Sequence, residues 1–297
     1  MLRIFLSLVF GASFCDAAIS AVNDNITAGV EQWRAERLAS LTAPEGWLSL
    51  VALKWLNPGP NTVGSAPDNS VVIPVGPQHL GKVIWRGDGK VTIEPTIDSE
   101  VLIDGKKSES SILVDDSNEN PTRVSFGTAL FYLVDRAGKK GLRIKDSKAS
   151  TRTQFVGLDY FPIDLSWHVE AKWVPFEAPK EIEVASIIGT KERARIAGKA
   201  VFERNGRSYE LIPIEESPDS LFFVFADKTS GKETYGAARF LNADLPKDGK
   251  VLLDFNCAFN PPCAFTTFAT CPLPPPGNRL DVAITAGEKK YRGEPEE

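Results

Sequence analysis

The residues best suited to chemistry gather in the last third of the chain. Glu233, Tyr235 and Arg239 have the same parity along a predicted strand, so their side chains point to one face of a sheet. Asp254 and Asn256 share a face at the end of another predicted strand. If these strands are neighbours, Arg239 can pair with Asp254 and leave the other three side chains around a pocket. Such a pocket suits a small polar or anionic ligand; the alternative is a buried ion pair that only holds a loop.

Carboxylates of this pocket could also support hydrolysis. Glycoside hydrolysis uses a carboxylic acid and a carboxylate on opposite sides of the scissile bond. Glu233 and Asp254 are the candidate catalytic pair, and Asp227 or Glu288 could supply one member instead. The distance between these groups decides the mechanism, and the sequence does not contain it.

Residues 1–18 have the layout of a secretory signal peptide. Arg3 is a short positive region, Ile4 to Phe14 is apolar and uncharged, and small residues follow Cys15. The apolar stretch is too short to cross a bilayer core of about 30 Å as a helix. We therefore expect an exported protein, periplasmic or extracellular, with no integral membrane segment after the signal is removed.

Export governs the interpretation of the cysteines. The mature chain keeps Cys257, Cys263 and Cys271. In an oxidising compartment, the short loop between Cys263 and Cys271 favours a disulfide. A zinc site needs four ligands and usually includes histidine, so no metal is predicted. The alternative role for Cys263 is a nucleophile with His168 as its base, although His168 lies in a predicted strand.

Composition excludes some classes of function. The formal net charge is -5, so the chain has no excess of Lys or Arg to neutralise phosphates, and nucleic acid is not expected as a partner. The sequence has no dinucleotide-binding fingerprint, no phosphate-cradling loop and no Gly-x-Ser-x-Gly nucleophile motif. No cofactor is predicted, and the oligomeric state stays open.

The elements that must position these residues are mostly strands. An amphipathic helix is predicted from Thr27 to about Leu41, with apolar residues three and four positions apart. After Pro58, short runs of β-branched and aromatic residues alternate with turn residues such as Asp104-Gly105 and Asn205-Gly206. The strands are predicted at 71–75, 82–86, 90–94, 100–104, 123–126, 130–135, 142–146, 167–176, 181–188, 193–203, 208–214, 221–226, 235–240, 251–255 and 280–286.

These predictions define an all-β fold with two packed β-domains. A helix and packing segment occupies residues 19–57, a β-sandwich 58–150, and a second β-sandwich or barrel 151–297. A loop at 256–278 contains all the mature cysteines and six prolines. Loops of this length are usually functional or disordered, and the prolines and cysteines favour an ordered one. Trp33, Trp47 and Trp55 are interpreted as a hydrophobic cluster, with a ligand platform as the alternative.

The first half resembles a forkhead-associated (FHA) domain, a sandwich that binds phosphothreonine. The similarity rests on Asn61–Ser65, Asn69–Ile73, His79–Val83 and Val101–Gly105. The family's phosphate-binding arginine corresponds to Ser65 and its serine to Gly76, so the resemblance implies the fold without phosphothreonine binding.

A second resemblance extends from about residue 30 to 291. The chain is similar to the family catalogued as domain of unknown function 1684, which implies kinship without an activity. Cys257 departs from that pattern. Motifs that carry this resemblance include Gly46–Leu50, Trp55-Leu56, Asn61–Gly64, Gly141–Arg143, Asn260–Phe265 and Cys271–Pro275. Its motifs also contain the candidate ligand-binding residues Asp227, Thr229, Tyr235, Arg239, Asn256, Asn260, Arg279 and Glu288.

Three hypotheses about function follow. The protein binds a small polar or anionic ligand with Arg239 as the anchor, or it is a hydrolase that uses Glu233, Asp254 or Cys263. In the third hypothesis, it is a structural or interaction protein whose motifs only stabilise the fold.

Overall fold

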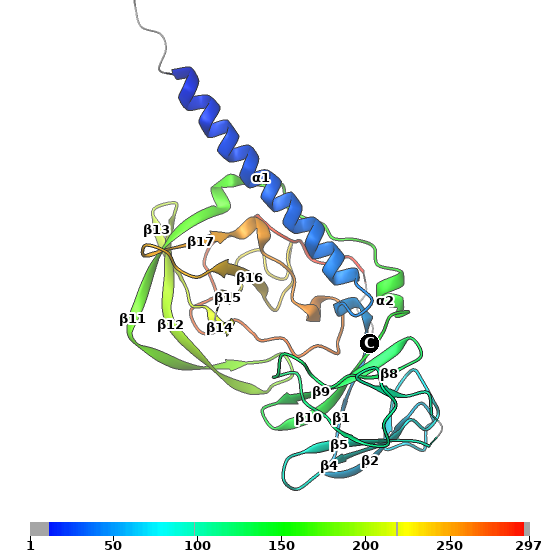
Figure 1. The fold of residues 1–297 in the computed structure, drawn as a ribbon. Helices are drawn as coiled ribbons and strands as arrows, with labels where there is room; N and C mark the ends of the chain where they lie inside the picture. The colour runs from blue at the N-terminus through cyan, green and yellow to red at the C-terminus, as the bar shows by residue number, and fades with distance from the viewer. Residues whose placement is uncertain (1–11, 98, 218, 294–297) are drawn as a thin grey trace, which may run out of the picture.

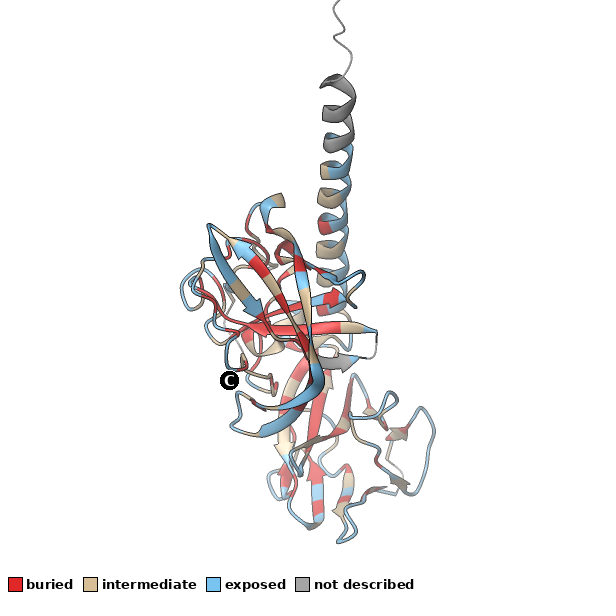
Figure 2. Cartoon of the chain, turned by 90° about the vertical axis from the view of Figure 1, so that its left-hand side faces the viewer, coloured by how far each residue is buried: buried red, intermediate tan, exposed pale blue. Residues whose placement is uncertain are grey.

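A long helix begins the described part of the chain. The computed structural model describes residues 12–97, 99–217 and 219–293, so most of the predicted signal peptide lies outside the described residues. Helix α1 spans Ala12–Thr42 and is longer than the predicted Thr27–Leu41 segment, because no proline interrupts this region. Its first turns project beyond the strands (Figure 1). The residues that it buries, Val30 and Leu41, lie in its C-terminal half (Figure 2), which contacts short helices of the chain. No helix within the described residues is long and apolar enough to cross a membrane.

Two five-stranded sheets form the predicted sandwich. Strand β1 pairs with β10, so the sandwich begins before residue 58, where the sequence placed its boundary. One sheet has the order β1 (Leu50–Trp55), β10 (Lys139–Asp146), β9 (Ala129–Arg136), β8 (Val124–Phe126) and β6 (Leu102–Ile103). The other has the order β3 (Val71–Val72), β2 (Gly59–Gly64), β4 (Gly81–Trp85), β5 (Val91–Pro95) and β7 (Ser111–Ile112).

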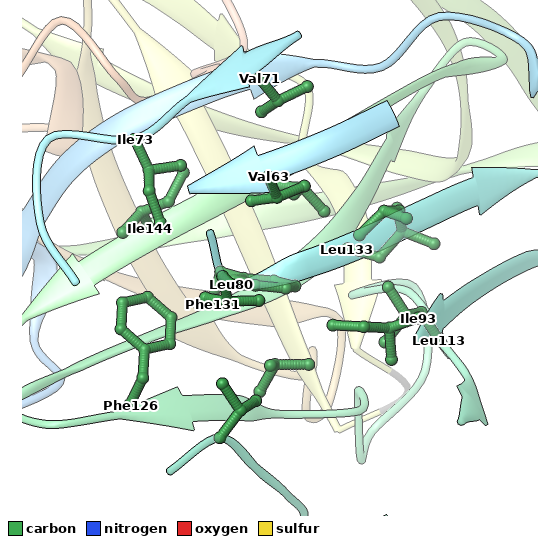
Figure 3. Packing of buried hydrophobic residues seen from close by; sticks show 14 of the residues in the cluster. Val63, Val71, Ile73, Leu80, Ile93, Leu113, Phe126, Phe131, Leu133 and Ile144 are labelled. Carbon is green, nitrogen blue, oxygen red and sulfur yellow. The ribbon is translucent and has the colours of Figure 1, made fainter. Parts of the chain in front are cut away.

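The core of the sandwich is built from alternate residues of its strands. Phe131 and Leu133 of β9 point to the same face and meet Val63 and Ile93 of the opposite sheet (Figure 3). These four side chains are at most 1% exposed. The position of the phosphate-binding arginine in FHA domains is Ser65, whose hydroxyl donates to the Gly76 carbonyl at 3.0 Å.

The second half contains two further sheets with separate buried clusters. Short helices precede, connect or follow the strands along the whole chain: η1 (Trp47–Ser49), α2 (Ser150–Thr153), η2 (Leu165–Trp167), η3 (Phe255–Cys257) and η4 (Pro262–Ala264). A four-stranded sheet has the order β13 (Arg207–Leu211), β12 (Lys191–Arg204), β11 (His168–Ala185) and β17 (Lys250–Asp254). A three-stranded sheet has the order β14 (Ile214–Ser217), β15 (Ser220–Phe225) and β16 (Arg239–Asp244).

The strand predictions differ from the structure at several places, and strands β2, β7 and β14 were not predicted. The predicted strands 167–176 and 181–188 form one strand, β11, with an irregularity between Pro175 and Lys180. The strand predicted at 235–240 begins only at Arg239. Residues 280–286 form no strand, because the carbonyls of Ile284 and Ala286 accept hydrogen bonds from Arg239 rather than from a neighbouring strand.

The β11–β12 hairpin connects the two halves of the molecule. It extends below the C-terminal sheets toward β9 and β10 (Figure 1). Near its tip, the amide of Ile187 donates to the carbonyl of Cys271 at 2.9 Å, and the amide of Leu273 donates to the carbonyl of Ala185 at 2.8 Å. The long loop 256–278 is therefore tied to the hairpin by backbone hydrogen bonds.

Candidate functional site

Arg239 is a fully buried residue whose partner differs from the predicted one. Its guanidinium pairs with Asp227, which is also buried, and not with Asp254. It also donates to the carbonyls of Ala286 at 2.7 Å and Ile284 at 3.0 Å. Arg239 therefore holds the final segment against β16, which is the structural alternative considered for this residue.

Asp227 and Thr229 complete this buried network. The amide of Thr229 donates to the Asp227 carboxylate at 2.7 Å, and the hydroxyl of Thr229 is 2.9 Å from that of Thr234. A second buried ion pair joins α1 to the same segment, with Arg37 Nε 2.9 Å from Glu288 Oε1. The other carboxylate oxygen of Glu288 accepts from the amide of Asn260 at 2.8 Å.

Asp254 belongs to a different group of residues. Its carboxylate is 2.8 Å from His168 Nδ1 and accepts from the side chain of Asn256 at 2.9 Å. Asn256 also bonds both backbone groups of Asp164, at 2.9 and 3.0 Å. These contacts close the end of the β11–β17 pair.

The other predicted site residues point elsewhere. Glu233 and Arg279 are exposed, and the hydroxyl of Tyr235 donates to the carbonyl of Cys263 at 3.1 Å. The predicted residues therefore form separate supports for the C-terminal loops, and none of the predicted catalytic or ligand-binding residues lines the cavity described below.

The predicted disulfide between Cys263 and Cys271 is present. A disulfide sulfur has no thiolate to attack with, so the predicted role of Cys263 as a nucleophile would require the reduced form. Cys257 is a free cysteine. Burial, with a smaller effect from Asp254, raises the pKa of its thiol to about 12, so Cys257 is protonated at neutral pH.

A cavity of about 680 Å³ lies between the sandwich and the C-terminal sheets. This volume falls in the range of about 300–1,000 Å³ that is typical of ligand pockets. The sandwich contributes Trp47, Asp116, Tyr132, Arg136 and Arg143; the β11–β12 hairpin contributes Val184, Ala185, Ser186, Glu192, Arg193, Ala194 and Arg195; the remaining lining residues are Ile214, Phe222, Phe240, Pro262, Ala269, Thr270, Cys271 and Pro272.

One wall of the cavity is polar and rigidly built. Arg136 forms a two-point contact with Asp116, with distances of 2.8 and 2.6 Å to the two carboxylate oxygens. Arg143 is only 3% exposed, and its Nη1 is 3.5 Å from the same carboxylate. The hydroxyl of Thr270 accepts from Arg136 Nε at 2.9 Å and from Arg143 Nη2 at 3.0 Å. Thr270 therefore anchors the disulfide loop to the sandwich.

Arg143 has fewer partners than a buried guanidinium needs. Its Nε has no hydrogen-bond partner among the described residues, and its nearest carboxylate is shared with Arg136. Its guanidinium carbon lies 5.5 Å from the centre of the Trp47 ring. Burial, with a further contribution from Arg143, lowers the pKa of the neighbouring Lys145 to about 8.

The residues that line the cavity carry a net positive formal charge, although the whole protein is acidic. Among the described lining residues, four arginines face two carboxylates, Asp116 and Glu192, whereas the whole chain has a formal charge of -5. A concave surface with an excess of one charge sign raises the local concentration of ligands of the opposite sign. The cavity is therefore suited to an anion.

The arginines that line this cavity were not among the predicted site residues, which lie in the last third of the chain. Trp47 and Arg143 both lie in motifs that carry the resemblance to domain of unknown function 1684. The sequence feature that could have indicated this site is therefore the presence of an arginine and a tryptophan in family motifs of the first half. Trp47 does not form a cluster with Trp33 and Trp55: Trp33 packs on Phe259, and Trp55 is 39% exposed.

Comparison with known proteins identifies the family. The profile described as "Protein of unknown function (DUF1684)" matches residues 153–289. An uncharacterised protein of Haloarcula marismortui, solved by solution NMR, is 33% identical, with 48% of this chain and 81% of that chain covered and a TM-score of 0.39. The chain belongs to the DUF1684 family. The matched part of this DUF1684 protein includes the β11–β12 hairpin and the disulfide loop.

Other comparisons add no activity for the DUF1684 protein. The crystal structure of Rad53 residues 1–466 in complex with AMP-PNP is 10% identical in sequence to this chain. The match covers 65% of this chain and 46% of that chain, with a TM-score of 0.19. No curated protein matches the sequence.

Proposed function

We propose that the protein binds a small anionic ligand in the cavity between its two β-rich halves, with Arg143 as the anchor. The observation that carries the proposal is the incomplete set of partners around this buried guanidinium. A buried charge is costly unless it is paired and hydrogen-bonded. An anion in the cavity would supply the missing partner, and the positive balance of the lining favours its entry.

This proposal keeps the predicted class of ligand and moves its anchor from Arg239 to Arg143. Arg239 also has an unpartnered Nε, but Asp227 and two carbonyls bind its other nitrogens and it does not line the cavity. No observation favours the hydrolase hypothesis, since Glu233 is exposed and Cys263 is oxidised. Asp227, Asn256 and Glu288 fit the hypothesis that many family motifs stabilise the fold.

Calorimetric titration tests the proposal directly. The probes are the sodium salts of phosphate, citrate and simple monocarboxylates. We expect saturable binding by the wild type and at least tenfold weaker binding by Arg143→Met. The matched control is Arg86→Met, which removes an exposed arginine from a hairpin turn of the same sandwich and should leave binding unchanged.

Two results would contradict the proposal. One is a wild-type protein that binds none of the probes. The other is a folded Arg143→Met variant with wild-type affinity. If Arg143→Met does not fold, Arg143→Lys replaces it, because lysine keeps the charge and lacks the planar two-point fork. Retained affinity in Arg143→Lys would then show that the fork is not the anchor.

We further infer that the protein works outside the cytoplasm. The disulfide between Cys263 and Cys271 supports an oxidising compartment, and residues 1–18 have the layout of a signal peptide. Deletion of residues 2–18 should retain the protein in the cytoplasm of its host, as measured by cell fractionation. Unchanged export of the deletion variant would contradict this inference.

A further inference from the structure

We propose that the ligand is an amphipathic carboxylate, with its head on Arg143 and an acyl chain along the opposite wall of the cavity. This inference rests on the proposed anion site and adds the class of the rest of the molecule. It follows from the unequal chemistry of the two walls. The sandwich side carries Arg143, Arg136 and Asp116. The C-terminal side has the charged residues Glu192, Arg193 and Arg195 on β12, and most of its other lining residues are apolar.

The apolar wall is a hydrophobic cluster that remains partly open. Phe222 and Phe240 lie edge to face, with ring centres 4.9 Å apart, and both line the cavity. They are 8% and 6% exposed, whereas Phe223 and Phe225, on the other face of β15, are completely buried. Val184, Ala194, Ile214 and Ala269 continue the same wall.

Trp47 joins the two walls. Its ring lies below the Arg143 guanidinium, and the same side chain packs against the apolar cluster of Phe222 and Phe240. A ligand whose anionic end meets Arg143 can therefore continue over Trp47 onto the phenylalanine rings. A free inorganic anion would use only the polar wall and would leave the apolar wall against water.

The size and charge of the cavity agree with this ligand class. A volume of about 680 Å³ exceeds what one small inorganic anion fills. Each methylene transferred from water to an apolar wall strengthens binding by up to about fourfold. A neutral chain of the same length would leave Arg143 without its partner, and an amine would meet the positive lining.

A chain-length series tests the inference by calorimetric titration of the intact protein. The probes are acetate, butanoate, hexanoate and octanoate, with octan-1-ol, octylamine and inorganic phosphate as comparisons. We expect affinity to rise with each methylene and octanoate to bind on the order of 100-fold more tightly than butanoate. Octan-1-ol and octylamine should bind at least tenfold more weakly than octanoate.

Variants locate the two ends of the ligand. Arg143→Met should weaken octanoate binding at least tenfold while it leaves the dependence on chain length in place. Phe222→Leu, which keeps an apolar wall but removes the ring, should reduce the gain from hexanoate to octanoate. The exposed Arg86→Met variant should bind the whole series like the wild type.

The outcomes separate this inference from the proposed anion site. If phosphate and acetate bind through Arg143 with the affinity of octanoate, the anion site stands and the acyl chain is wrong. If Arg143→Met binds octanoate as tightly as the wild type, the acyl ligand occupies another place and the inference is wrong. If no anion of either panel binds, both proposals fail.

Discussion

Asp227→Asn should lower the free energy of unfolding by about 3–5 kcal/mol, because it leaves the charge of Arg239 buried without a counterion. Both side chains of the pair are 0% exposed, so water cannot replace the lost carboxylate. The carbonyls of Ala286 and Ile284 remain as acceptors at 2.7 and 3.0 Å, but they carry no net charge. Asparagine keeps the shape of the side chain, so the change removes charge with little loss of packing.

An exposed ion pair provides the control. Lys191 and Glu183 are 2.7 Å apart, and their side chains are 63% and 61% exposed. Glu183→Gln removes the same charge from a solvated pair and should cost about 1 kcal/mol or less. Equilibrium urea unfolding followed by far-UV circular dichroism measures both variants under one set of conditions.

A double variant tests the reasoning further. In Asp227→Asn/Arg239→Met no charge is left buried, so the protein should recover part of the stability that Asp227→Asn loses. Equal small losses in Asp227→Asn and Glu183→Gln would refute the argument from burial. A double variant less stable than Asp227→Asn alone would show that packing of the arginine stem, rather than its charge, dominates.

Three further predictions concern the cysteines and Lys145. Reduction should raise the mass of the intact protein by two hydrogen atoms, and Cys263→Ser/Cys271→Ser should be less stable by about 2–3 kcal/mol in urea unfolding; an unchanged mass would contradict the disulfide. Cys257, whose thiol pKa burial raises to about 12, should resist iodoacetamide at pH 8 in the folded protein and react after unfolding in urea, and rapid native labelling would contradict its burial. Burial lowers the pKa of Lys145 to about 8 from 10.5, so the unfolded chain binds more protons between these values and stability should rise with pH across them, relative to Lys145→Met; parallel pH profiles of the two proteins would contradict this shift.

Patterns that depend on near neighbours were predicted well from the sequence. The Asn205-Gly206 turn has positive φ at both residues, 52° and 72°, as a two-residue hairpin loop requires. Most strands of the sandwich were predicted at or close to their observed places, because alternation along a strand reflects burial of one face. The disulfide was also predicted, since its cysteines are only eight residues apart.

Contacts between distant segments could not be predicted in this way. Parity along the predicted strands indicated Asp254 as the partner of Arg239, whereas the structure pairs Arg239 with Asp227. The error arose because β16 begins at Arg239, so that residues 233–238 form turns rather than the strand on which the parity argument depended. The partner of Arg37, Glu288, lies 251 positions away, and nothing local to either residue indicates the pairing.

The sequence by itself determined the β-rich class, the family, the hairpin turns and the disulfide, because each depends on short-range periodicity, on recognisable motifs or on close spacing. Only the tertiary structure decided the candidate site. Its polar wall requires Thr270 to reach Arg143 and Arg136, which are 127 and 134 positions away, and its apolar wall comes from a hairpin and a separate sheet. A cavity between two cores is a property of how they pack, and no segment of the chain contains it alone.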